Sequence, residues 1–407
     1  MVKLVQPPGD ERVINEALGI GWANWDFPAH LAYSQRAMTA VWPTAIIAAP
    51  PEPQPLCYAP AELDLSQLTL SEPGSDRSLT AQQILDRRLY NDALLVMHRG
   101  KVIHESYRNG MMATDHHVNH STTKSLTTLL LGLAISEGLV DPAAPITEYL
   151  RPLADLPNWA KISVQQALDM RTGLNYEEHY EDPDCVCWSY FRATGYYPPL
   201  PETSPGYIAW VRKNMRDATG EPGERFAYAS PITNALGLVT AAVFGKSVPE
   251  LLEEKIYRHI GAERDAWLNL DPSGVAVTEG QLSLCLRDFA RWAALFMNEG
   301  RNLAGEQVVP SAFIRDIVTP REELRSAWQR GDYADLFPAG QYRNQTYVID
   351  AECSQIAMLG IHGQFCFIDL NRELMMVGYG SYPTQVDAIL ATTMQALWNE
   401  LRRYVGL

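Results

Sequence analysis

Long apolar runs are missing from this sequence, and its beginning lacks the features of an export signal. No stretch of about 18 consecutive apolar residues occurs, which is the length that a membrane-spanning helix requires. The segment Met1–Asp10 contains two prolines and has no long apolar core. The six cysteines are scattered over 407 residues, as is typical of free thiols in a reducing compartment. We therefore expect a cytoplasmic protein without a membrane span.

Basic residues are also scarce. The chain has 33 lysines and arginines against 48 aspartates and glutamates, which gives a net charge of −15. A nucleic-acid backbone or an anionic membrane would repel such a protein, so we expect neither as a partner. The apolar fraction of 46%, with ten tryptophans and 19 tyrosines, indicates a globular protein. Its length allows one large domain or two subdomains.

Several common catalytic and cofactor-binding motifs are absent. The sequence has no Gly-x-Ser-x-Gly elbow, no His-Glu-x-x-His, no P-loop and no Gly-x-Gly-x-x-Gly. The run His116-His117-x-x-His120 has no evident carboxylate or cysteine partner, which favours a surface or supporting role over metal binding. The pair Cys185-x-Cys187 is too closely spaced for a zinc knuckle. We expect neither a metal nor a cofactor.

The stretch Ser121-Thr122-Thr123-Lys124 is the most informative feature that is present. It opens a leucine-rich helical pattern that ends at Gly138. Three residues of helix place Lys124 on the same face as Ser121. A lysine among leucines loses hydration, so its neutral amine can take a proton from a serine hydroxyl. The alternative is an N-cap serine followed by a solvated lysine.

A second candidate stretch runs from Gly223 to Asn234. Tyr228 and Ser230 lie on the same side of an extended segment, just before a helix that begins near Pro231. A phenol beside an ammonium can relay a proton, so Tyr228 suits the base for Ser121 or the acid for a leaving group. The alternative is a tyrosine that only packs its ring.

A third candidate stretch is Gly360-Ile361-His362-Gly363, which enters an apolar strand. Its two glycines allow the backbone to approach a ligand closely. A backbone N–H from this segment, together with that of Ser121, would form an oxyanion hole. For the His362 ring, a structural imidazole at a turn is favoured over a direct catalytic role.

The strand patterns lie near both ends of the predicted core, with helices between them. Residues 93–98 and 101–107 predict a hairpin around Arg99-Gly100, and strands return at 346–349, 365–370 and 374–378. Helices are predicted at 164–170, 204–216, 288–297 and 386–401. This order predicts an N-terminal wrapping arm at 1–80, an α/β subdomain at 81–144 and 301–407, and a mostly helical subdomain at 145–300.

Together, the three candidate stretches resemble the serine β-lactamase and penicillin-recognising superfamily, in its class C-like and family VIII esterase branch. Its Ser-x-x-Lys motif matches Ser121–Lys124, and its Tyr-x-Asn/Ser motif matches Tyr228–Ser230. Its Lys/His-x-Gly segment corresponds to Gly360–Gly363. The resemblance runs from about residue 85 to residue 405 of the sequence. It implies an α+β, β-lactamase-like fold, with an antiparallel sheet flanked by helices and a mostly helical inserted subdomain.

Within that superfamily the chain is most similar to the 6-aminohexanoate-dimer hydrolases, amidases that also cleave carboxylic esters. The shared features include the Trp-rich start and Tyr180-Glu181-Asp182-Pro183. By this resemblance, Tyr180 contacts the scissile amide nitrogen and Ile361 supplies the second oxyanion N–H. The other residues expected around the oxyanion or the substrate are Ser230, His362 and Gly363, with Trp188, Phe191 and Ser283 in the substrate pocket.

The loop after Pro183 departs from the pattern that dimer hydrolysis would favour. An acidic group there would hold a substrate ammonium, but residues 185–191 are mostly apolar and aromatic, which suits an acyl or aryl group. We therefore expect a cofactor-free serine hydrolase of a small amide or ester. The alternatives are a carboxylesterase on short acyl esters, a β-lactamase or DD-peptidase, and a non-catalytic binding protein. A homodimer is expected by resemblance only.

Overall fold

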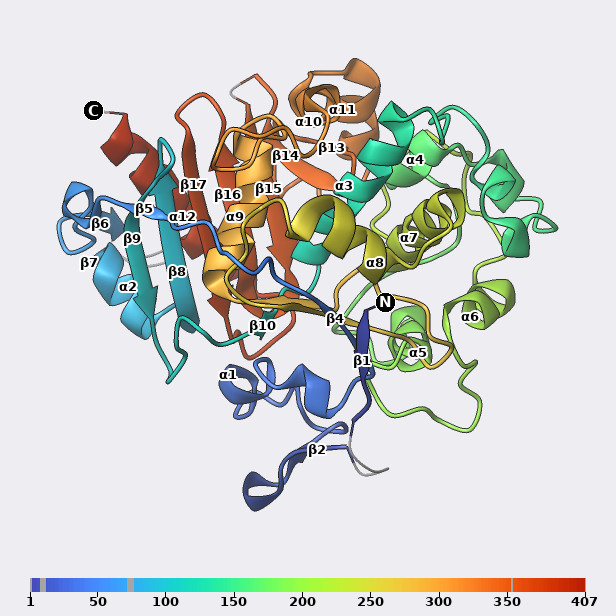
Figure 1. Ribbon diagram of the computed structural model, residues 1–407. Helices are drawn as coiled ribbons and strands as arrows, with labels where there is room; N and C mark the ends of the chain where they lie inside the picture. Colours follow the sequence, from blue (N-terminus) through green and yellow to red (C-terminus); the bar gives the residue numbers. More distant parts are fainter. Residues whose placement is uncertain (1, 8–11, 72–76, 353, 407) are drawn as a thin grey trace.

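An eight-stranded sheet forms the centre of the structure (Figure 1). The computed structural model describes residues 2–7, 12–71, 77–352 and 354–406. Across the sheet the strands follow the order β13 (Gln341–Arg343), β14 (Thr346–Asp350), β15 (Gln355–Gly360), β16 (Gln364–Asp369), β17 (Leu374–Gly380), β8 (Asn91–His98), β9 (Lys101–Tyr107) and β5 (Cys57–Tyr58). Neighbouring strands are antiparallel, except that β5 runs parallel to β9. Segments about 280 residues apart therefore meet where β17 pairs with β8.

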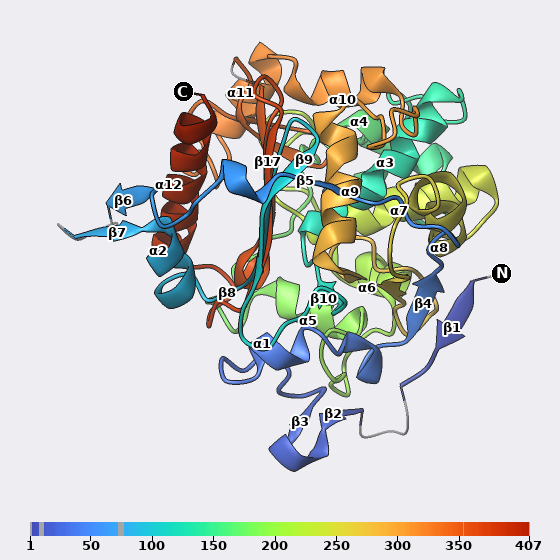
Figure 2. The same cartoon turned by 60° about the vertical axis from the view of Figure 1, so that its left-hand side comes forward.

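Helices cover both faces of this sheet, as the view along its edge shows (Figure 2). One face packs against α12 (Ala388–Val405) and α2 (Ala81–Arg87), and the other against α9 (Leu286–Met297) and α3 (Thr122–Ser136). Side chains alternate along β8, because successive residues of a strand point to opposite faces. Leu94 and Val96 therefore join the α12 side of the core, whereas Leu95 and Met97 join the α9 side. Burial on both faces explains the nearly continuous apolar run in this strand.

The hairpin between β8 and β9 closes with the two-residue turn that the sequence predicts. Arg99 and Gly100 both have positive φ, 48° and 74°. Two consecutive residues in this region suit a tight turn whose twist matches that of the flanking strands.

A second, five-stranded antiparallel sheet carries the chain into the candidate site. Its strands follow the order β1 (Lys3–Val5), β4 (Thr44–Ile47), β11 (Ala266–Asn269), β12 (Leu282–Leu284) and β10 (His117–Val118). Directly after β10, the backbone N–H of Asn119 donates to the carbonyl of Leu282 at 2.8 Å. The sheet therefore fixes the chain two residues before Ser121.

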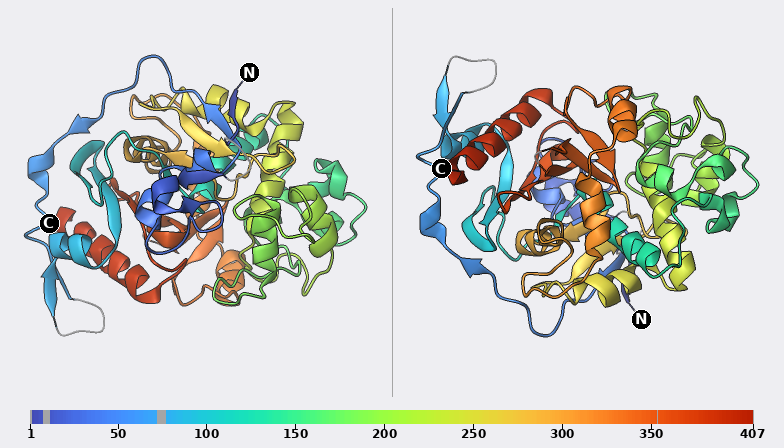
Figure 3. Two further views of the ribbon diagram at one scale, coloured as in Figure 1. Left: turned by 90° about the horizontal axis from the view of Figure 1, so that it is seen from below. Right: turned by 90° about the horizontal axis from the view of Figure 1, so that it is seen from above.

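The N-terminal segment contributes to both sheets and runs over the outside of the molecule. After β4 the chain passes along the periphery to reach β5 (Figure 3). Two small antiparallel pairs belong to this segment and the residues that follow it: β2 (Val13–Asn15) with β3 (Ile20–Gly21), and β6 (Thr69–Ser71) with β7 (Ser78–Thr80). Trp25 and Trp42 from this segment are completely buried.

The remaining helices gather mainly beside the large sheet (Figure 1). They are α1 (Leu31–Ser34), α4 (Val164–Leu168), α5 (Val186–Ala193), α6 (Tyr207–Asn214), α7 (Ser230–Phe244), α8 (Val248–Leu252), α10 (Ser311–Val318) and α11 (Glu322–Gln329). Short 3-10 or π turns lie at Glu16–Leu18, Met38–Ala40, Pro60–Glu62, Ile146–Glu148, Arg151–Leu153, Trp159–Lys161, Glu253–Tyr257 and Ile361–Gly363. Within the described ranges no single helix is long and apolar enough to cross a membrane, although α7 and the α8 region pass that test as a pair bent by 75°.

The predicted α+β architecture is confirmed, with helices on both faces of an antiparallel sheet that is assembled from both ends of the chain. The predicted leucine-rich helix, the hairpin and the late strands all occur, with bounds that differ by a few residues. The central strand expected at 374–378 is β17, which lies between β16 and β8. Strands β1, β4, β10, β11 and β12 were not predicted, because they are only two to four residues long and lack a clear alternation.

Candidate active site

Ser121 and Lys124 stand at the beginning of α3, and their side chains meet. The side-chain nitrogen Nζ of Lys124 lies 3.0 Å from Oγ of Ser121. The same nitrogen donates to the main-chain oxygen of Glu279 at 2.7 Å. Lys124 is only 1% exposed, and α3 is buried on nearly all sides. The solvated-lysine alternative is therefore wrong.

The environment of Lys124 favours its neutral form. Burial lowers the pKa of the Lys124 ammonium, because the charged form loses its hydration. The charges of Glu279 and Glu178 act in the opposite direction. A neutral amine that donates one hydrogen to the Glu279 carbonyl keeps its lone pair for the Ser121 hydroxyl.

The residue that precedes the serine has an unusual backbone conformation. His120 has φ of 44°, in the left-handed region that bulky residues rarely adopt. Its ring is 1% exposed, and neither ring nitrogen has a hydrogen-bond partner among the described residues. Burial lowers the pKa of this imidazole well below its usual value, so the ring stays neutral. The strained turn sets the position of Ser121 at the helix N-terminus.

Tyr228 approaches the same two residues from the segment before α7. Nζ of Lys124 lies 5.0 Å from the centre of the Tyr228 ring. Burial raises the pKa of the Tyr228 phenol well above its usual value, and nearby Tyr347 and Glu178 add to this effect. Interaction with the Ser121 side chain acts in the opposite direction. The phenol therefore keeps its proton and suits an acid better than a base.

Glu279 is a buried carboxyl group next to this set. Its side chain is 2% exposed, and Oε1 has no hydrogen-bond partner among the described residues. Oε2 accepts from the hydroxyl of Tyr196 at 3.3 Å. Burial raises the pKa of Glu279 to about 7, although the charge of Lys124 opposes the rise.

Glu178 accepts hydrogen bonds from donors in two segments of the site. Oε1 accepts from the hydroxyl of Tyr180 at 2.5 Å and from that of Ser230 at 2.9 Å. Oε2 accepts from the backbone N–H of Ser230 and from the hydroxyl of Tyr176, both at 3.1 Å. The first residue of α7 thus donates to a carboxylate, as a helix N-terminus favours.

The segment Gly360–Gly363 lies across the site from α3. Gly363 has φ of 87°, and a Cβ there would lie 2.4 Å from the Tyr382 ring. Only glycine fits this position without displacing the ring. A Cβ at Gly360 would lie 2.8 Å from the carbonyl of Asn119, so this strand end also passes close to the chain before Ser121.

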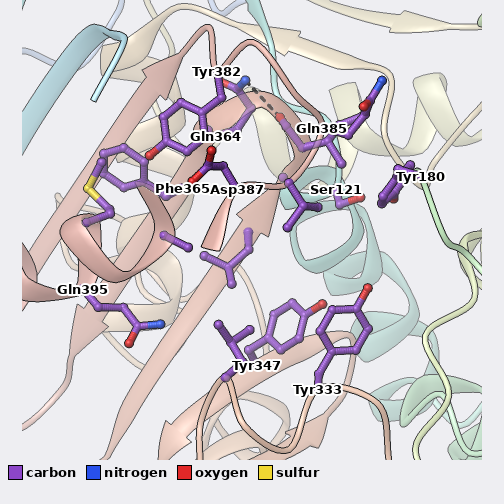
Figure 4. Close-up of a pocket in the computed structure, with 18 of the residues that line it drawn as sticks. Ser121, Tyr180, Tyr333, Tyr347, Gln364, Phe365, Tyr382, Gln385, Asp387 and Gln395 are labelled. Carbon is purple, nitrogen blue, oxygen red and sulfur yellow. Dashed lines mark hydrogen bonds between the residues drawn. The ribbon is translucent and has the colours of Figure 1, made fainter. Parts of the chain in front are cut away.

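Two cavities meet at Ser121, Tyr180 and Ile361. The larger has a volume of about 140 Å³ and extends from Ser121 between β15, β16 and α12 (Figure 4). It is lined by Ser121, Tyr180, Tyr228, Tyr333, Leu336, Tyr347, Leu359, Gly360, Ile361, Gly363, Gln364, Phe365, Phe367, Tyr382, Gln385, Val386, Asp387, Ala391, Met394 and Gln395. The smaller cavity, about 10 Å³, is lined by His120, Ser121, Glu178, Tyr180, Trp188, Phe191, Tyr196, Tyr197, Ser230, Glu279, Ile361 and Gln385.

The structure brings most of the predicted site residues together at these cavities. The residues that line one or both of them are Ser121, Tyr228, Tyr180, Ile361, Gly363, Ser230, Trp188 and Phe191. Lys124 lies directly behind Ser121. Ser230 does not offer its hydroxyl proton to the cavity, because that hydroxyl donates to Glu178.

Two predicted site residues, Ser283 and His362, line neither cavity. Ser283 is in β12, where it pairs with Val118 and Trp267, and it lines neither cavity. His362 is fully buried. Its backbone N–H donates to the carbonyl of Gln385, and the ring nitrogen Nδ1 lies 2.9 Å from the carbonyl of Tyr382. The His362 ring therefore has the structural role that the sequence favoured.

The histidine run before Ser121 consists of three separately packed rings. His116 stacks on Trp267 with ring centres 3.6 Å apart, and His117 stacks on Tyr379 at 4.5 Å. Among the residues that the structure describes, no group of three His, Cys, Asp or Glu side chains is arranged to hold a metal ion.

Sequence reasoning missed Glu178 and Glu279. Glu178 lies only two residues before Tyr180, and this closeness in sequence is a signal that could have identified it. Glu279 carried no such signal, because it contacts Lys124 across 155 residues.

Fold and site together define a serine hydrolase of the β-lactamase family, to which the chain belongs. The model of the β-lactamase family matches residues 77–392. Over 299 residues the chain is 30% identical to 6-aminohexanoate-dimer hydrolase of Paenarthrobacter ureafaciens, and the match covers 72% of this chain and 73% of that protein. The protein is therefore a hydrolase of the class that cleaves amides or esters.

Solved structures share the fold. A Bacillus anthracis protein described as a candidate 6-aminohexanoate-dimer hydrolase superposes with a TM-score of 0.83 at 23% identity, covering 95% of this chain and 97% of that one. A family VIII carboxylesterase gives a TM-score of 0.57 at 17% identity, covering 79% and 95%. At these identities the likeness establishes the fold alone.

Proposed function

We propose that the protein cleaves a small neutral amide or ester through an acyl-enzyme on Ser121. The observation that carries this proposal is the 3.0 Å separation between Nζ of Lys124 and Oγ of Ser121. A serine hydroxyl is a weak nucleophile unless a base lies within hydrogen-bond reach. The lowered pKa of buried Lys124 supports the neutral amine as that base.

Acylation follows from these positions. Oγ of Ser121 attacks the carbonyl carbon while its proton passes to Nζ of Lys124. The oxyanion that forms accepts hydrogen bonds from the backbone N–H groups of Ser121 and Ile361. The tetrahedral intermediate then collapses, and the bond from carbon to the leaving nitrogen or oxygen breaks.

Tyr228 serves as the proton relay in this scheme. Its phenol, which keeps its proton through burial, donates to the leaving group, and the Lys124 ammonium replaces that proton. Water then attacks the acyl-enzyme, with its proton passing to Lys124, and releases the acid and Ser121. We therefore assign the base to Lys124 alone, whereas the sequence analysis left that role open to Tyr228 as well.

The lining of the larger cavity favours a substrate group that is uncharged and apolar. Its lining contains no lysine, arginine or histidine, and its one charged residue type is acidic, at Asp387. A carboxylate on the substrate would lose hydration there without gaining a cation. Leu359, Phe367 and Met394 instead offer apolar contact to an alkyl chain or a ring. Neutral alkyl or aryl amides and esters are therefore the candidate substrates, whereas the 6-aminohexanoate dimer named for the Paenarthrobacter relative carries an ammonium and a carboxylate that this lining does not match.

Replacing Ser121 tests the proposal. We expect Ser121→Ala to lower kcat on a p-nitrophenyl acyl ester by a factor of roughly 10³ or more, because the nucleophile is lost. Ser136→Ala is the matched control, since Ser136 is exposed at the far end of the same helix. Its kcat should equal that of the unaltered enzyme, and circular dichroism should show both variants folded. Unchanged turnover in folded Ser121→Ala would refute the proposal.

A further inference from the structure

Glu178 determines which way the Tyr180 hydroxyl points its single proton. The hydroxyl donates to Oε1 of Glu178 across 2.5 Å. Burial and the nearby Glu178 raise the pKa of the Tyr180 phenol well above its usual value, so the proton stays on the phenol. With that proton directed at Glu178, the oxygen of Tyr180 has only lone pairs left for any other partner.

Tyr180 places this oxygen in the cavity region beside Ser121, where a reacting substrate must bind. Its side chain lines both cavities that meet at Ser121, and the larger of them is drawn in Figure 4. A carbonyl attacked by Ser121 therefore has one of its two substituents beside Tyr180. A secondary amide carries an N–H next to its carbonyl, whereas an ester carries an oxygen that can only accept.

We propose that Glu178 is a positioning residue that makes Tyr180 a hydrogen-bond acceptor for the substrate, and thereby favours amides with an N–H over esters. This inference rests on the proposed function, because it needs the substrate carbonyl at Ser121. An amide N–H gains a partner at Tyr180, but an ester oxygen meets a second acceptor there. Glu178 itself need not touch the substrate.

The remaining contacts of Glu178 explain why a carboxylate is required. All four hydrogen bonds to its two oxygens come from donors, two of them from Ser230. Three of these donors are hydroxyls, which can turn and accept, but the backbone N–H of Ser230 cannot. In Glu178→Gln the amide oxygen must therefore face that N–H, which directs the new NH₂ group towards Tyr180. Tyr180 then accepts from residue 178 and points its own proton into the cavity.

The test compares two substrates that differ only at the leaving atom. Hydrolysis of p-nitrophenyl hexanoate and of the p-nitroanilide of hexanoic acid gives the ratio of kcat/KM for amide to that for ester. We expect Glu178→Gln to lower this ratio roughly 10- to 100-fold, because the amide N–H now faces a donor, whereas loss of the Glu178 charge near Lys124 changes the amide and ester rates alike. Glu178→Asp keeps two acceptor oxygens and should keep the ratio within about threefold of that of the unaltered enzyme.

Tyr176→Phe is the matched control. It removes one donor from the same carboxylate but leaves the bond from Tyr180 to Glu178 in place. Its ratio should stay unchanged. An unchanged ratio in Glu178→Gln, or an equal fall in Tyr176→Phe, would overturn the inference while leaving the proposed function intact. Loss of the proposed function would appear instead as a Ser121→Ala variant that still cleaves the ester.

A second measurement needs no variant at position 178. The N-methyl form of the anilide lacks the N–H, so the unaltered enzyme should cleave it roughly 10- to 100-fold more slowly than the anilide. Each enzymatic rate is first divided by the rate at which hydroxide hydrolyses the same compound without enzyme. Equal corrected rates for the two anilides would show that no acceptor in the site binds the amide N–H, and would likewise overturn the inference.

Discussion

The side-chain nitrogen of Lys124 donates to the main-chain oxygen of Glu279 across 2.7 Å, although 155 residues separate them. The carboxyl group of the same glutamate is buried and raises the pKa of Lys124 through its charge. Two effects therefore meet at Lys124: burial favours the neutral amine, and Glu279 moderates that effect.

Lys124 should control the pH dependence of activity. Its pKa is lowered from 10.5 by burial, and the reactive form is the neutral amine. The kcat/KM for a neutral ester should therefore rise with pH through the pKa of Lys124, at a pH below 10.5. Lys124→Met should lower kcat by a factor of roughly 10² to 10⁴, as loss of a general base does. A pH–rate profile of both proteins checks this, and a folded Lys124→Met enzyme with full activity would contradict it.

Glu279→Gln should shift that profile. The negative charge of Glu279 favours the Lys124 ammonium, so its removal lowers the pKa of Lys124 further. We expect the acid limb of kcat/KM to move to lower pH in Glu279→Gln. Glu221→Gln, at an exposed carboxyl, is the control and should leave the limb in place. A shift to higher pH would show that Glu279 acts on Lys124 in some other way.

Glu279 should also make stability depend on pH. Burial raises its pKa from 4.5 to about 7, so the folded protein holds this proton more tightly than the unfolded chain. The resulting stability is fully present below pH 4.5 and is lost as pH rises through about 7. Its size is at most about 3 kcal/mol. Urea unfolding at pH 5 and pH 8 should show a smaller loss in Glu279→Gln than in the unaltered protein, and equal losses would count against this assignment.

Gly363→Ala should disturb both stability and the oxyanion segment. A Cβ at this position lies 2.4 Å from the Tyr382 ring, in addition to the strain of φ at 87°. Gly100→Ala is the matched control, because φ there is 74° but nothing lies within 4 Å of the added Cβ. We expect each variant to lose about 1 kcal/mol or more of unfolding free energy from backbone strain, and Gly363→Ala to lose more. Only Gly363→Ala should lose activity, which thermal unfolding and ester kinetics together would check.

Ala391→Trp should close the larger cavity to long substrates. Ala391 lies on α12 and lines that cavity, whereas Thr392, the next residue, is exposed. We expect Ala391→Trp to lower kcat/KM for p-nitrophenyl octanoate more than for p-nitrophenyl acetate. Thr392→Trp should leave kcat/KM for both esters equal to that of the unaltered enzyme. Equal effects of Ala391→Trp on the two esters would place the substrate chain elsewhere.

Local patterns were sufficient to predict that the side chains of Ser121 and Lys124 meet. Ser121 and Lys124 are three residues apart on one helix, so their meeting depends on helix geometry alone. Tyr228 was predicted from its motif before α7, although its approach to Ser121 depends on tertiary packing. The strongly patterned elements, such as the β8–β9 hairpin and β17, were likewise predictable.

The rest of the site depends on contacts that no local pattern records. Glu279 reaches Lys124 through the packing of the chain before β12, and Glu178 reaches Ser230 across 52 residues. Ser283 was misplaced because a small polar residue in a short, fully buried strand has no distinguishing periodicity. The five-stranded sheet was missed for the same reason, yet it positions the chain just before Ser121.

Trapping the nucleophile tests the central claim most directly. After incubation with a fluorophosphonate, peptide mass spectrometry should locate a single phosphonyl adduct on Oγ of Ser121, and an excess of an intact ester substrate present during the incubation should slow its formation. Lys124→Met should react far more slowly, because the hydroxyl has lost its base. An adduct on any other residue, or equal labelling of Ser121→Ala, would contradict this account.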